Sequence, residues 1–276
     1  MAERLASVAR MSVLITGAGM GMGRIYAEKA VVDGAHRVIL WDIDAALLAT
    51  ANTELSGRGT EIRTQAVDVS SLDAVRAAAA EVLAEAPIDV LINNAGIVRG
   101  TYFWEHDQER DIAATMSINA LAPMHITREF LPTMMQSDRQ GRIVNIASAA
   151  GLVSNPRMSI YAASKWALIG WSDSLRLELA QVGNTTLRVT TICPTYIKTG
   201  MFEGAKGPML TPLMTPERVT DRVWKALLRG EAQVLMPWTV HLSKVLKGIL
   251  PLAAWDFVAG NIFGVYSTMK NFTGRR

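Results

Sequence analysis

Short apolar runs alternate with amphipathic or alanine-rich segments along most of the chain. The runs are rich in β-branched residues, which is typical of buried strands, and the segments between them are long enough for helices. We predict strands at residues 12–16, 37–41, 61–67, 89–92, 142–146, 187–192 and 233–236. We predict helices at residues 24–32, 45–55, 72–84, along a long stretch through Asn119, at 161–180 and at 216–228. The last of these has Thr215 as N-cap and Pro216 at the first helical position.

Strands that alternate with helices in this way predict right-handed crossovers and a parallel sheet that is covered on both faces. The expected fold class is therefore α/β, with a doubly wound parallel sheet. Ligands of such sheets bind beyond the carboxyl ends of the strands. No internal repeat or linker divides the chain, so we expect one domain over residues 1–276.

The C-terminal residues, 238–276, predict a helical extension of that domain. Their apolar positions recur at helical spacing in two stretches, the first at Trp238, Leu242, Val245, Leu246, Ile249 and Leu250, and the second at Trp255, Phe257, Val258, Ile262, Phe263 and Tyr266. The extension holds five basic residues against one acid, whereas residues 1–237 hold 23 against 24. Two interpretations stay open. The extension packs on the sheet or on another subunit, or it walls an apolar substrate pocket and makes a peripheral membrane contact, with its basic residues near anionic headgroups.

Composition narrows the class of protein further. Half of the 276 residues are hydrophobic and 19% are charged, which excludes disordered, collagen-like and coiled-coil chains. The net charge of +3 is small, and residues 1–237 are close to neutral, so we expect no nucleic-acid partner. Cys193 is the only cysteine, and the four histidines lack metal-ligand spacing, so we expect no disulfide and no metal. Without a secretory signal or an apolar run of ~18 residues, the expected location is cytoplasmic.

A glycine-rich segment lies between the first predicted strand and the first predicted helix. It has the pattern T-G-x-x-x-G-x-G at Thr16, Gly17, Gly21 and Gly23. Backbone N–H groups and the helix dipole can hold a pyrophosphate at such a place. A lone glycine cluster is also compatible with a flexible turn, but its position after a strand favours a cofactor site.

This spacing resembles that of the short-chain dehydrogenase/reductase family, and further motifs follow in the family's order. They are Asp42 after the second strand, Asp68-Val69 after the third, Asn93-Asn94-Ala95-Gly96 after the fourth, Asn119 in the next helix, Ser148 after the fifth strand, and Tyr161-x-x-x-Lys165. Together they are far more specific than any one alone. The resemblance implies a Rossmann-like NAD-binding fold, and the C-terminal extension resembles that of the 17β-hydroxysteroid and retinol dehydrogenase branch.

The resemblance also implies which residues contact the dinucleotide. They are Gly17, Gly19, Met20, Gly21, Met22, Gly23, Asp42, Ile43, Asp68, Val69, Asn94, Ala95, Gly96, Tyr161, Lys165, Pro194, Ile197 and Thr199. Asp42 can accept hydrogen bonds from the adenosine ribose and would repel a 2′-phosphate, so NAD is the predicted cofactor; the alternative is that Asp42 only caps the following helix. Met20, where NADP-preferring members often have a basic residue, also favours NAD. Thr195 departs from the family's Pro-Gly pair and adds a side chain near the nicotinamide.

Four residues are the candidate catalytic set. Tyr161 and Lys165 lie four apart, so they share a helix face, and a lysine ammonium near a phenol lowers the phenol pKa from its usual value of ~10. Such a pair alone is usually a surface contact, but the 13-residue spacing from Ser148 to Tyr161 matches the family. The resemblance implies that Ser148 bonds the substrate oxygen, that Tyr161 exchanges its proton, and that Lys165 holds the nicotinamide ribose. It further implies that Asn119 fixes a water linked to Lys165.

These features predict an NAD(H)-dependent oxidoreductase. It interconverts a lipophilic secondary alcohol, of a steroid, retinoid or long-chain kind, and its ketone, with Tyr161 as general acid and base. One alternative is an acyl-thioester ketoreductase of the same family, which Asp42 disfavours because that activity goes with NADPH. Another is a non-catalytic NAD-binding sensor or scaffold, because a fold alone does not prove catalysis. The resemblance also implies a homodimer or homotetramer that forms through the helices with Asn119 and Tyr161.

Overall fold

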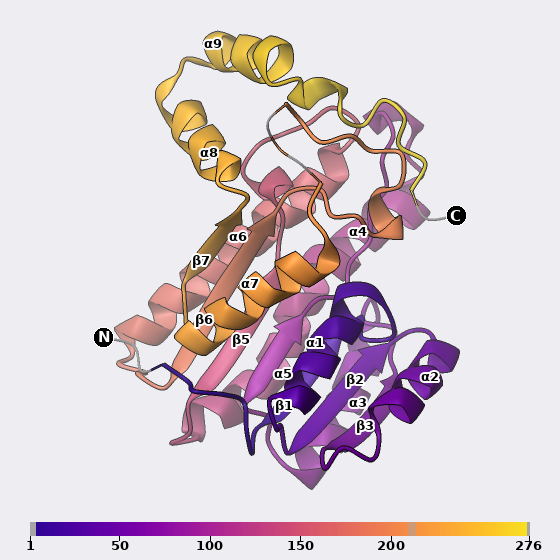
Figure 1. Cartoon of the computed structure of the whole chain (residues 1–276), viewed down its shortest axis with the longest axis vertical. Helices are drawn as coiled ribbons and strands as arrows, with labels where there is room; N and C mark the ends of the chain where they lie inside the picture. The colour runs from indigo at the N-terminus through magenta and orange to yellow at the C-terminus, as the bar shows by residue number, and fades with distance from the viewer. Residues whose placement is uncertain (1–3, 210, 212, 275–276) are drawn as a thin grey trace.

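A parallel sheet organises the computed structural model, which describes residues 4–209, 211 and 213–274 (Figure 1). The strands are β1 (Ser12–Thr16), β2 (Arg37–Asp42), β3 (Glu61–Ala66), β4 (Val90–Asn93), β5 (Gly141–Ile146), β6 (Leu187–Pro194) and β7 (Gln233–Met236). Their order is β3-β2-β1-β4-β5-β6-β7, and all neighbouring pairs are parallel. The order reverses direction between β1 and β4, which is where ligands of such sheets bind.

Helices cover both faces of this sheet. They are α1 (Gly21–Val32), α2 (Ala45–Leu55), α3 (Leu72–Glu85), α4 (Ala114–Met116), α5 (Ala122–Gln136), α6 (Ser159–Gln181), α7 (Pro216–Arg229), α8 (Thr239–Ile249) and α9 (Leu252–Phe257). One hydrophobic cluster joins the sheet to α1, α2 and α7, and a second joins it to α3, α5 and α6. The predicted doubly wound α/β architecture is therefore confirmed.

Burial along each strand reflects its place in the sheet. β1 and β5 are buried at every position because helices lie on both of their faces. β3, at the edge, keeps exposed positions along its length. The predicted strands and helices are all present, with ends that shift by a few residues. The largest shift is at α1, which begins at Gly21 instead of Arg24, so that its N-terminus lies inside the glycine segment.

The predicted long helix through Asn119 is not a regular helix. Two π-helical segments, Gln108–Ala113 and Ser117–Leu121, flank the single turn α4, and a regular helix resumes at α5. A π-helical turn holds one more residue than an α-helical turn, which changes the direction of the side chains on it. Asn119 lies in the second of these segments and is fully buried.

The C-terminal helices stand apart from the sheet. Figure 1 shows α8 and α9 at the upper end of the molecule, beyond β7 and far from β1 to β3. Val240 is the buried residue of α8, and Trp255 is the buried residue of α9. Lys247 attaches α8 to the domain, because its Nζ donates to the Leu152 carbonyl at 2.9 Å and lies over the Trp166 ring. In the part of the chain that the structure describes, no helix is long and apolar enough to cross a bilayer.

Candidate active site

A cleft lies at the carboxyl ends of the central strands, with about 1310 Å³ of empty space that is partly open to solvent. Of the predicted site residues, the cleft is lined by Gly17, Met20, Gly21, Met22, Asp42, Ile43, Asp68, Val69, Asn94, Ala95, Gly96, Ser148, Tyr161, Lys165, Pro194, Ile197 and Thr199. It is also lined by Thr195, as expected from its place after Pro194, and by residues that the motifs did not include, namely Val67, Ile97, Ile118, Ile146, Ala147, Met201 and Phe202. Most of these are sequence neighbours of motif residues at strand ends. Gly19, Gly23 and Asn119 are predicted site residues that do not line the cleft.

The glycine segment leaves backbone uncovered at the start of α1. Gly17 and Gly21 both have left-handed backbone, with φ of +63° and +57°, and a Cβ on Gly21 would meet no atom within 4 Å. A Cβ on Gly23 would come within 2.0 Å of the Gly17 carbonyl oxygen, so only glycine lets the helix start pack on the loop. The open space at Gly21 lies where helix N–H groups attract an anion. This cradle fits a pyrophosphate.

Asp42 lies at the end of β2, beside the glycine segment. Its Oδ2 accepts a hydrogen bond from the Gly19 N–H at 2.8 Å, and its Oδ1 accepts one from the Asp44 N–H at 3.1 Å. The N-cap of α2 is Asp44, whose side chain accepts from the Ala46 and Leu47 N–H groups. The alternative that Asp42 only caps this helix is therefore wrong. Gly19 supports the loop by donating to Asp42 and does not itself line the cleft.

Asn94 fastens the loop after β4 to the glycine segment. Its Nδ2 donates to the Thr16 and Gly17 carbonyls at 3.0 and 3.1 Å. Thr16 Oγ1 accepts in turn from the Asn94 and Ala95 N–H groups, both at 3.0 Å. These four bonds fix two walls of the cleft relative to each other before any ligand binds.

The candidate catalytic side chains meet at the inner end of the cleft. Ser148 follows β5, whereas Tyr161 and Lys165 project from the first turns of α6, and all three are buried. Lys165 Nζ lies 5.7 Å from the Tyr161 ring centroid and donates to the Ile146 carbonyl at 2.8 Å. Ser148 Oγ accepts from the Ala150 N–H at 3.1 Å, which makes it the cap of a short 3₁₀ turn as well as a neighbour of Tyr161.

Burial sets the protonation of this group. It raises the pKa of Tyr161 to about 12, with a hydrogen bond from Ser148 acting in the opposite direction. It lowers the pKa of Lys165 to about 8. Burial exceeds the lowering by Ser148, so the phenol pKa of the chain alone lies above its usual value, and a lowering by Lys165 stays a prediction.

Asn119 supports the site from behind. Its Oδ1 accepts from the Ile97 N–H at 2.8 Å, and its Nδ2 donates to the Ile97 carbonyl at 2.9 Å and to Ser164 Oγ at 3.2 Å. The amide therefore holds the backbone next to Gly96. A Cβ on Gly96 would lie 3.1 Å from Asn119 Oδ1 and 3.7 Å from Lys165 Nζ, so these two atoms border the same small space. A water held there by Asn119 stays a prediction.

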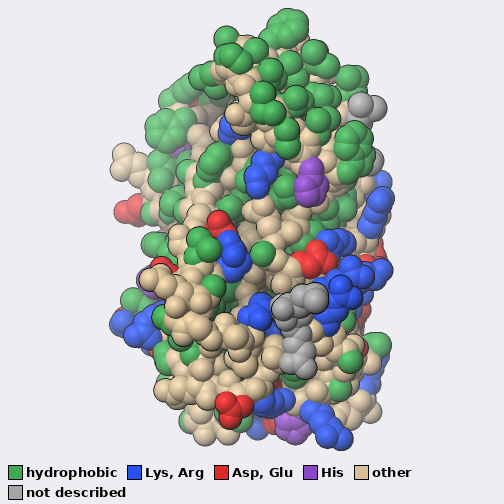
Figure 2. Space-filling view, turned by 90° about the vertical axis from the view of Figure 1, so that its left-hand side faces the viewer, with side chains coloured by type: hydrophobic (Ala, Val, Ile, Leu, Met, Phe, Trp, Pro, Cys, Tyr) green, Lys and Arg blue, Asp and Glu red, His purple; other side chains and the backbone are tan. Residues whose placement is uncertain are grey.

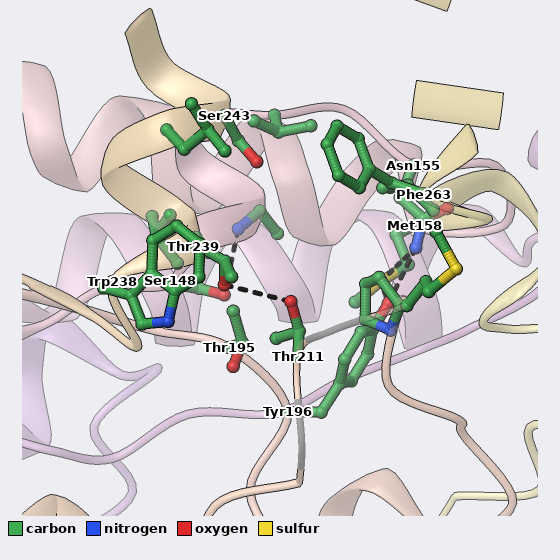
Figure 3. Close-up of a pocket in the computed structure, with 18 of the residues that line it drawn as sticks. Ser148, Asn155, Met158, Thr195, Tyr196, Thr211, Trp238, Thr239, Ser243 and Phe263 are labelled. Atoms are coloured by element: carbon green, nitrogen blue, oxygen red, sulfur yellow. Dashed lines mark hydrogen bonds between the residues drawn. The ribbon is translucent and has the colours of Figure 1, made fainter. Parts of the chain in front are cut away.

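A second, largely apolar cavity begins where the cleft ends. Both are lined by Ser148, Thr195 and Phe202, and the second has about 870 Å³ of empty space, partly open to solvent. Figure 3 shows Ser148, Trp238 and Thr239 on one side of it and Met158 and Tyr196 on the other. The other lining residues are Ala149, Ala150, Val153, Asn155, Pro208, Met209, Thr211, Val240, Leu242, Ser243, Phe263 and Val265.

The walls of this cavity come from distant parts of the chain. A hydrogen bond of 2.9 Å between the Thr211 and Thr239 hydroxyls joins the loop after β6 to α8. The Tyr196 hydroxyl accepts from Asn155 Nδ2 at 2.7 Å and is 2.8 Å from Thr268 Oγ1, which joins the same loop to the C-terminal segment. The C-terminal extension thus lines a cavity next to Tyr161.

Comparisons with known proteins agree with this geometry. The family model described as short chain dehydrogenase matches residues 11–208. The chain is 35% identical to an estradiol 17-beta-dehydrogenase 11 of Pongo abelii over 250 residues, which cover 90% of this chain and 82% of the relative. It is 33% identical to an epidermal retinol dehydrogenase 2 of Mus musculus over 274 residues, 98% of this chain and 87% of the relative.

Two solved structures are similar over most of the chain. One is a short chain dehydrogenase/reductase from Burkholderia phymatum in complex with NAD, with a TM-score of 0.79, 27% identity and coverage of 88% of this chain and 95% of that chain. The other is a metagenomic short-chain oxidoreductase in complex with NADP, with a TM-score of 0.69, 30% identity and coverage of 83% and 97%. The two neighbours thus hold different nicotinamide dinucleotides in a similar fold.

Proposed function

This chain belongs to the short-chain dehydrogenase family, in the branch of the 17β-hydroxysteroid and retinol dehydrogenases, and on that premise we propose that it is an NAD(H)-dependent oxidoreductase. Its substrate is a lipophilic secondary alcohol, of a steroid, retinoid or long-chain kind, or the corresponding ketone. One observation carries the proposal. Ser148, with Tyr161 beside it, lies where the dinucleotide cleft meets an apolar cavity, so an apolar molecule can reach both.

The residues of the cleft fit a nicotinamide dinucleotide. The open backbone at Gly21 would take the pyrophosphate, Asp42 the adenosine ribose and Lys165 the nicotinamide ribose. When bound, the oxidised nicotinamide supplies a hydride acceptor next to the substrate carbon. Asn94 and Thr16 keep the two sides of the cleft in register for it.

Proton transfer is the task of the buried side chains. In alcohol oxidation the Tyr161 phenolate accepts the hydroxyl proton, and Ser148 donates a hydrogen bond to the substrate oxygen. Lys165 Nζ lies 5.7 Å from the ring centroid, and where Lys165 is protonated its charge favours the phenolate. Because burial raises the pKa of Tyr161, the phenolate fraction grows with pH, and oxidation at saturating substrate should be faster at alkaline than at neutral pH.

A homologous series of secondary alcohols tests the proposal. Each added methylene that the cavity buries is worth ~0.8 kcal/mol, or roughly a fourfold gain in kcat/KM, so the rate with NAD should rise steadily with chain length until the cavity is full. The measurement is the absorbance of the reduced nicotinamide formed by purified protein. Turnover of small polar alcohols only, with none of the apolar ones, would contradict the proposed substrate class.

Asp42→Asn tests the choice of cofactor. Asparagine keeps an acceptor for the Gly19 N–H but removes the charge that repels a 2′-phosphate, so the preference for NAD over NADP in kcat/KM should fall by about tenfold or more. Asp44→Asn is the matched control, since Asp44 caps α2 and does not line the cleft. An unchanged preference in Asp42→Asn would show that this carboxylate does not select the cofactor.

The assembly and the location belong to the same proposal. Exposed apolar side chains on α5 and α6, such as Met135, Trp166 and Leu177, support a homodimer or homotetramer through these helices. A monomeric sedimentation profile would contradict this assembly.

The single cysteine of the sequence, Cys193, is buried, which fits a reducing, cytoplasmic setting.

A further inference from the structure

A buried polar atom lies at the end of the apolar cavity away from Ser148. It is Oδ1 of Asn155, a residue in the loop between Ser148 and Tyr161 that lines the cavity and is 8% exposed. Within the described residues, no group donates a hydrogen bond to this oxygen. A buried amide oxygen without a donor costs free energy, so nearly all such atoms in proteins have a partner. The partner of Asn155 Oδ1 is therefore expected from outside the chain.

The neighbours of the amide fix which of its two ends is unpaired. Thr268 Oγ1 donates to the Val265 carbonyl at 2.8 Å, so its single proton is used and it accepts from Asn155 Nδ2 at 2.7 Å. The other Nδ2 proton goes to the Tyr196 hydroxyl oxygen at 2.7 Å. Both N–H bonds of the amide are thus used within the chain. The unpaired end is the carbonyl, which accepts hydrogen bonds and cannot donate them.

Apolar side chains surround the amide in the part of the cavity that the structure describes. Met158, Phe263 and Val265 line this cavity, and their side chains have no N–H or O–H group. Met158 packs against the amide, with Sδ 3.9 Å from Nδ2, and its unbranched side chain can shift to admit a ligand. Hydrophobic side chains also cover the end of the molecule where α8 and α9 lie (Figure 2). A water on Oδ1 would find few further partners here, whereas buried waters usually have about three.

Asn155 is well separated from the reacting end of the cavity. Figure 3 shows Asn155 and Ser148 on opposite sides of it. Along the wall, the Tyr161 ring packs edge to face on Phe202, at 6.1 Å between centroids, and Phe202 packs in the same way on Tyr196, at 5.4 Å. Two aromatic rings therefore lie between the phenol of Tyr161 and the amide. A substrate group that reaches the amide is several carbon atoms away from the reacting one.

We propose that Asn155 Oδ1 accepts a hydrogen bond from a second hydroxyl group of the substrate, several carbon atoms from the carbinol that reacts at Tyr161. The preferred substrate is then a lipophilic diol, or the corresponding hydroxyketone, instead of a simple alcohol. This inference rests on the proposed function and narrows its substrate class. The distal hydroxyl orients the molecule and takes no part in hydride or proton transfer.

Straight-chain secondary alcohols that differ only at their far end test the acceptor. The compounds end in a hydroxyl or in a methoxy group and are compared at equal length over a range of lengths. At the length that reaches Asn155, wild type should bind the hydroxyl-ended compound about tenfold more tightly, because a methoxy oxygen accepts hydrogen bonds but cannot donate one. Binding is measured by calorimetry in the presence of NADH, with which an alcohol cannot be oxidised. The same preference should appear in kcat/KM with NAD.

Variants of Asn155 test the assignment. Asn155→Leu has a side chain of similar size without the carbonyl, so the preference for the hydroxyl-ended compound should disappear. Asn155→Asp keeps an acceptor oxygen, and the Tyr196 hydroxyl can donate to its other oxygen, so the preference should remain. Ser243→Ala is the matched control, because it removes a hydroxyl of α8 that lines the same cavity, and it should keep the wild-type preference.

The outcomes separate this inference from the proposed function. Equal binding of the two compounds by wild type at every length would overturn the inference, and so would a preference that Asn155→Leu retains or one for the methoxy end. Oxidation of both compounds at equal rates would leave the proposed function standing without the distal contact. Tighter binding of the hydroxyl-ended compound with no oxidation by NAD would support the contact and contradict the proposed function.

Discussion

Tyr161→Phe is expected to lower kcat for alcohol oxidation by about three orders of magnitude, while the affinity for NAD stays within about twofold. General acid and base catalysis contributes roughly 10²–10⁴ to enzymatic rates, and this variant removes the proton acceptor alone. The ring packs edge to face against Phe202 with centroids 6.1 Å apart, and phenylalanine keeps that contact. Ser148 keeps its hydrogen bond from the Ala150 N–H. The measurements are single-turnover kinetics and titration of the protein with NAD.

Tyr196→Phe is the matched control, because Tyr196 is a nearby tyrosine that lines the apolar cavity and not the dinucleotide cleft. Its hydroxyl bonds Asn155 and Thr268, so its loss should weaken packing of the C-terminal segment but keep turnover within about tenfold of wild type. Wild-type turnover by Tyr161→Phe would refute the proposed mechanism. A protein that binds NAD and turns over no alcohol, with or without Tyr161, would instead be the sensor that the sequence left open.

Lys165→Met is expected to abolish most turnover and to change how stability depends on pH. The pKa of Lys165 is lowered by burial from 10.5 to about 8 in the folded chain. Between pH 8 and 10.5 the unfolded chain therefore binds a proton that the folded chain does not, and the free energy of unfolding rises with pH across this window. The shift corresponds to about 3 kcal/mol at most, and below pH 8 the contribution is a constant destabilisation.

Urea unfolding of both proteins across the window measures this contribution. Wild type should gain up to about 3 kcal/mol relative to Lys165→Met between neutral pH and the upper end of the window. Tyr161, whose raised pKa acts in the opposite direction at higher pH, is present in both proteins and largely cancels in the difference. Lys225→Met changes an exposed position of α7, so its free energy of unfolding should depend on pH in the same way as that of wild type. If the free energy of unfolding of Lys165→Met also had the pH dependence of wild type, Lys165 would not be buried as the structure has it.

Local patterns predicted most of the fold and of the cleft. Strands such as β1 and β5 are short β-branched runs with no other plausible structure, and the motif residues follow them directly, so the parallel sheet brings Asp42, Asn94 and Ser148 to one edge. The position of each motif residue directly after a predicted strand is therefore enough to predict that these residues meet. The start of α1 differs from the prediction because a propensity argument does not favour glycines such as Gly21 and Gly23 inside a helix.

Other features depend on packing that spacing does not describe. Gly23 faces the Gly17 carbonyl instead of the cleft, and Asn119 lies in a π-helical turn with its amide bound to Ile97. The phenol pKa followed from the burial of Tyr161 and not from its distance to Lys165 along the helix. The apolar cavity needed the loop after β6 to meet a helix that begins at Thr239.

Asp42 accepts two hydrogen bonds, from the Gly19 and Asp44 N–H groups, and this has a consequence for how cofactor preference can evolve. The carboxylate that we propose to discriminate between NAD and NADP also holds the neighbouring backbone in place. Mutational routes toward the phosphorylated coenzyme that pass through a small aliphatic side chain lose both properties in one step. Routes that pass through an amide remove the charge and keep one of the two hydrogen bonds, because an amide has a single acceptor oxygen.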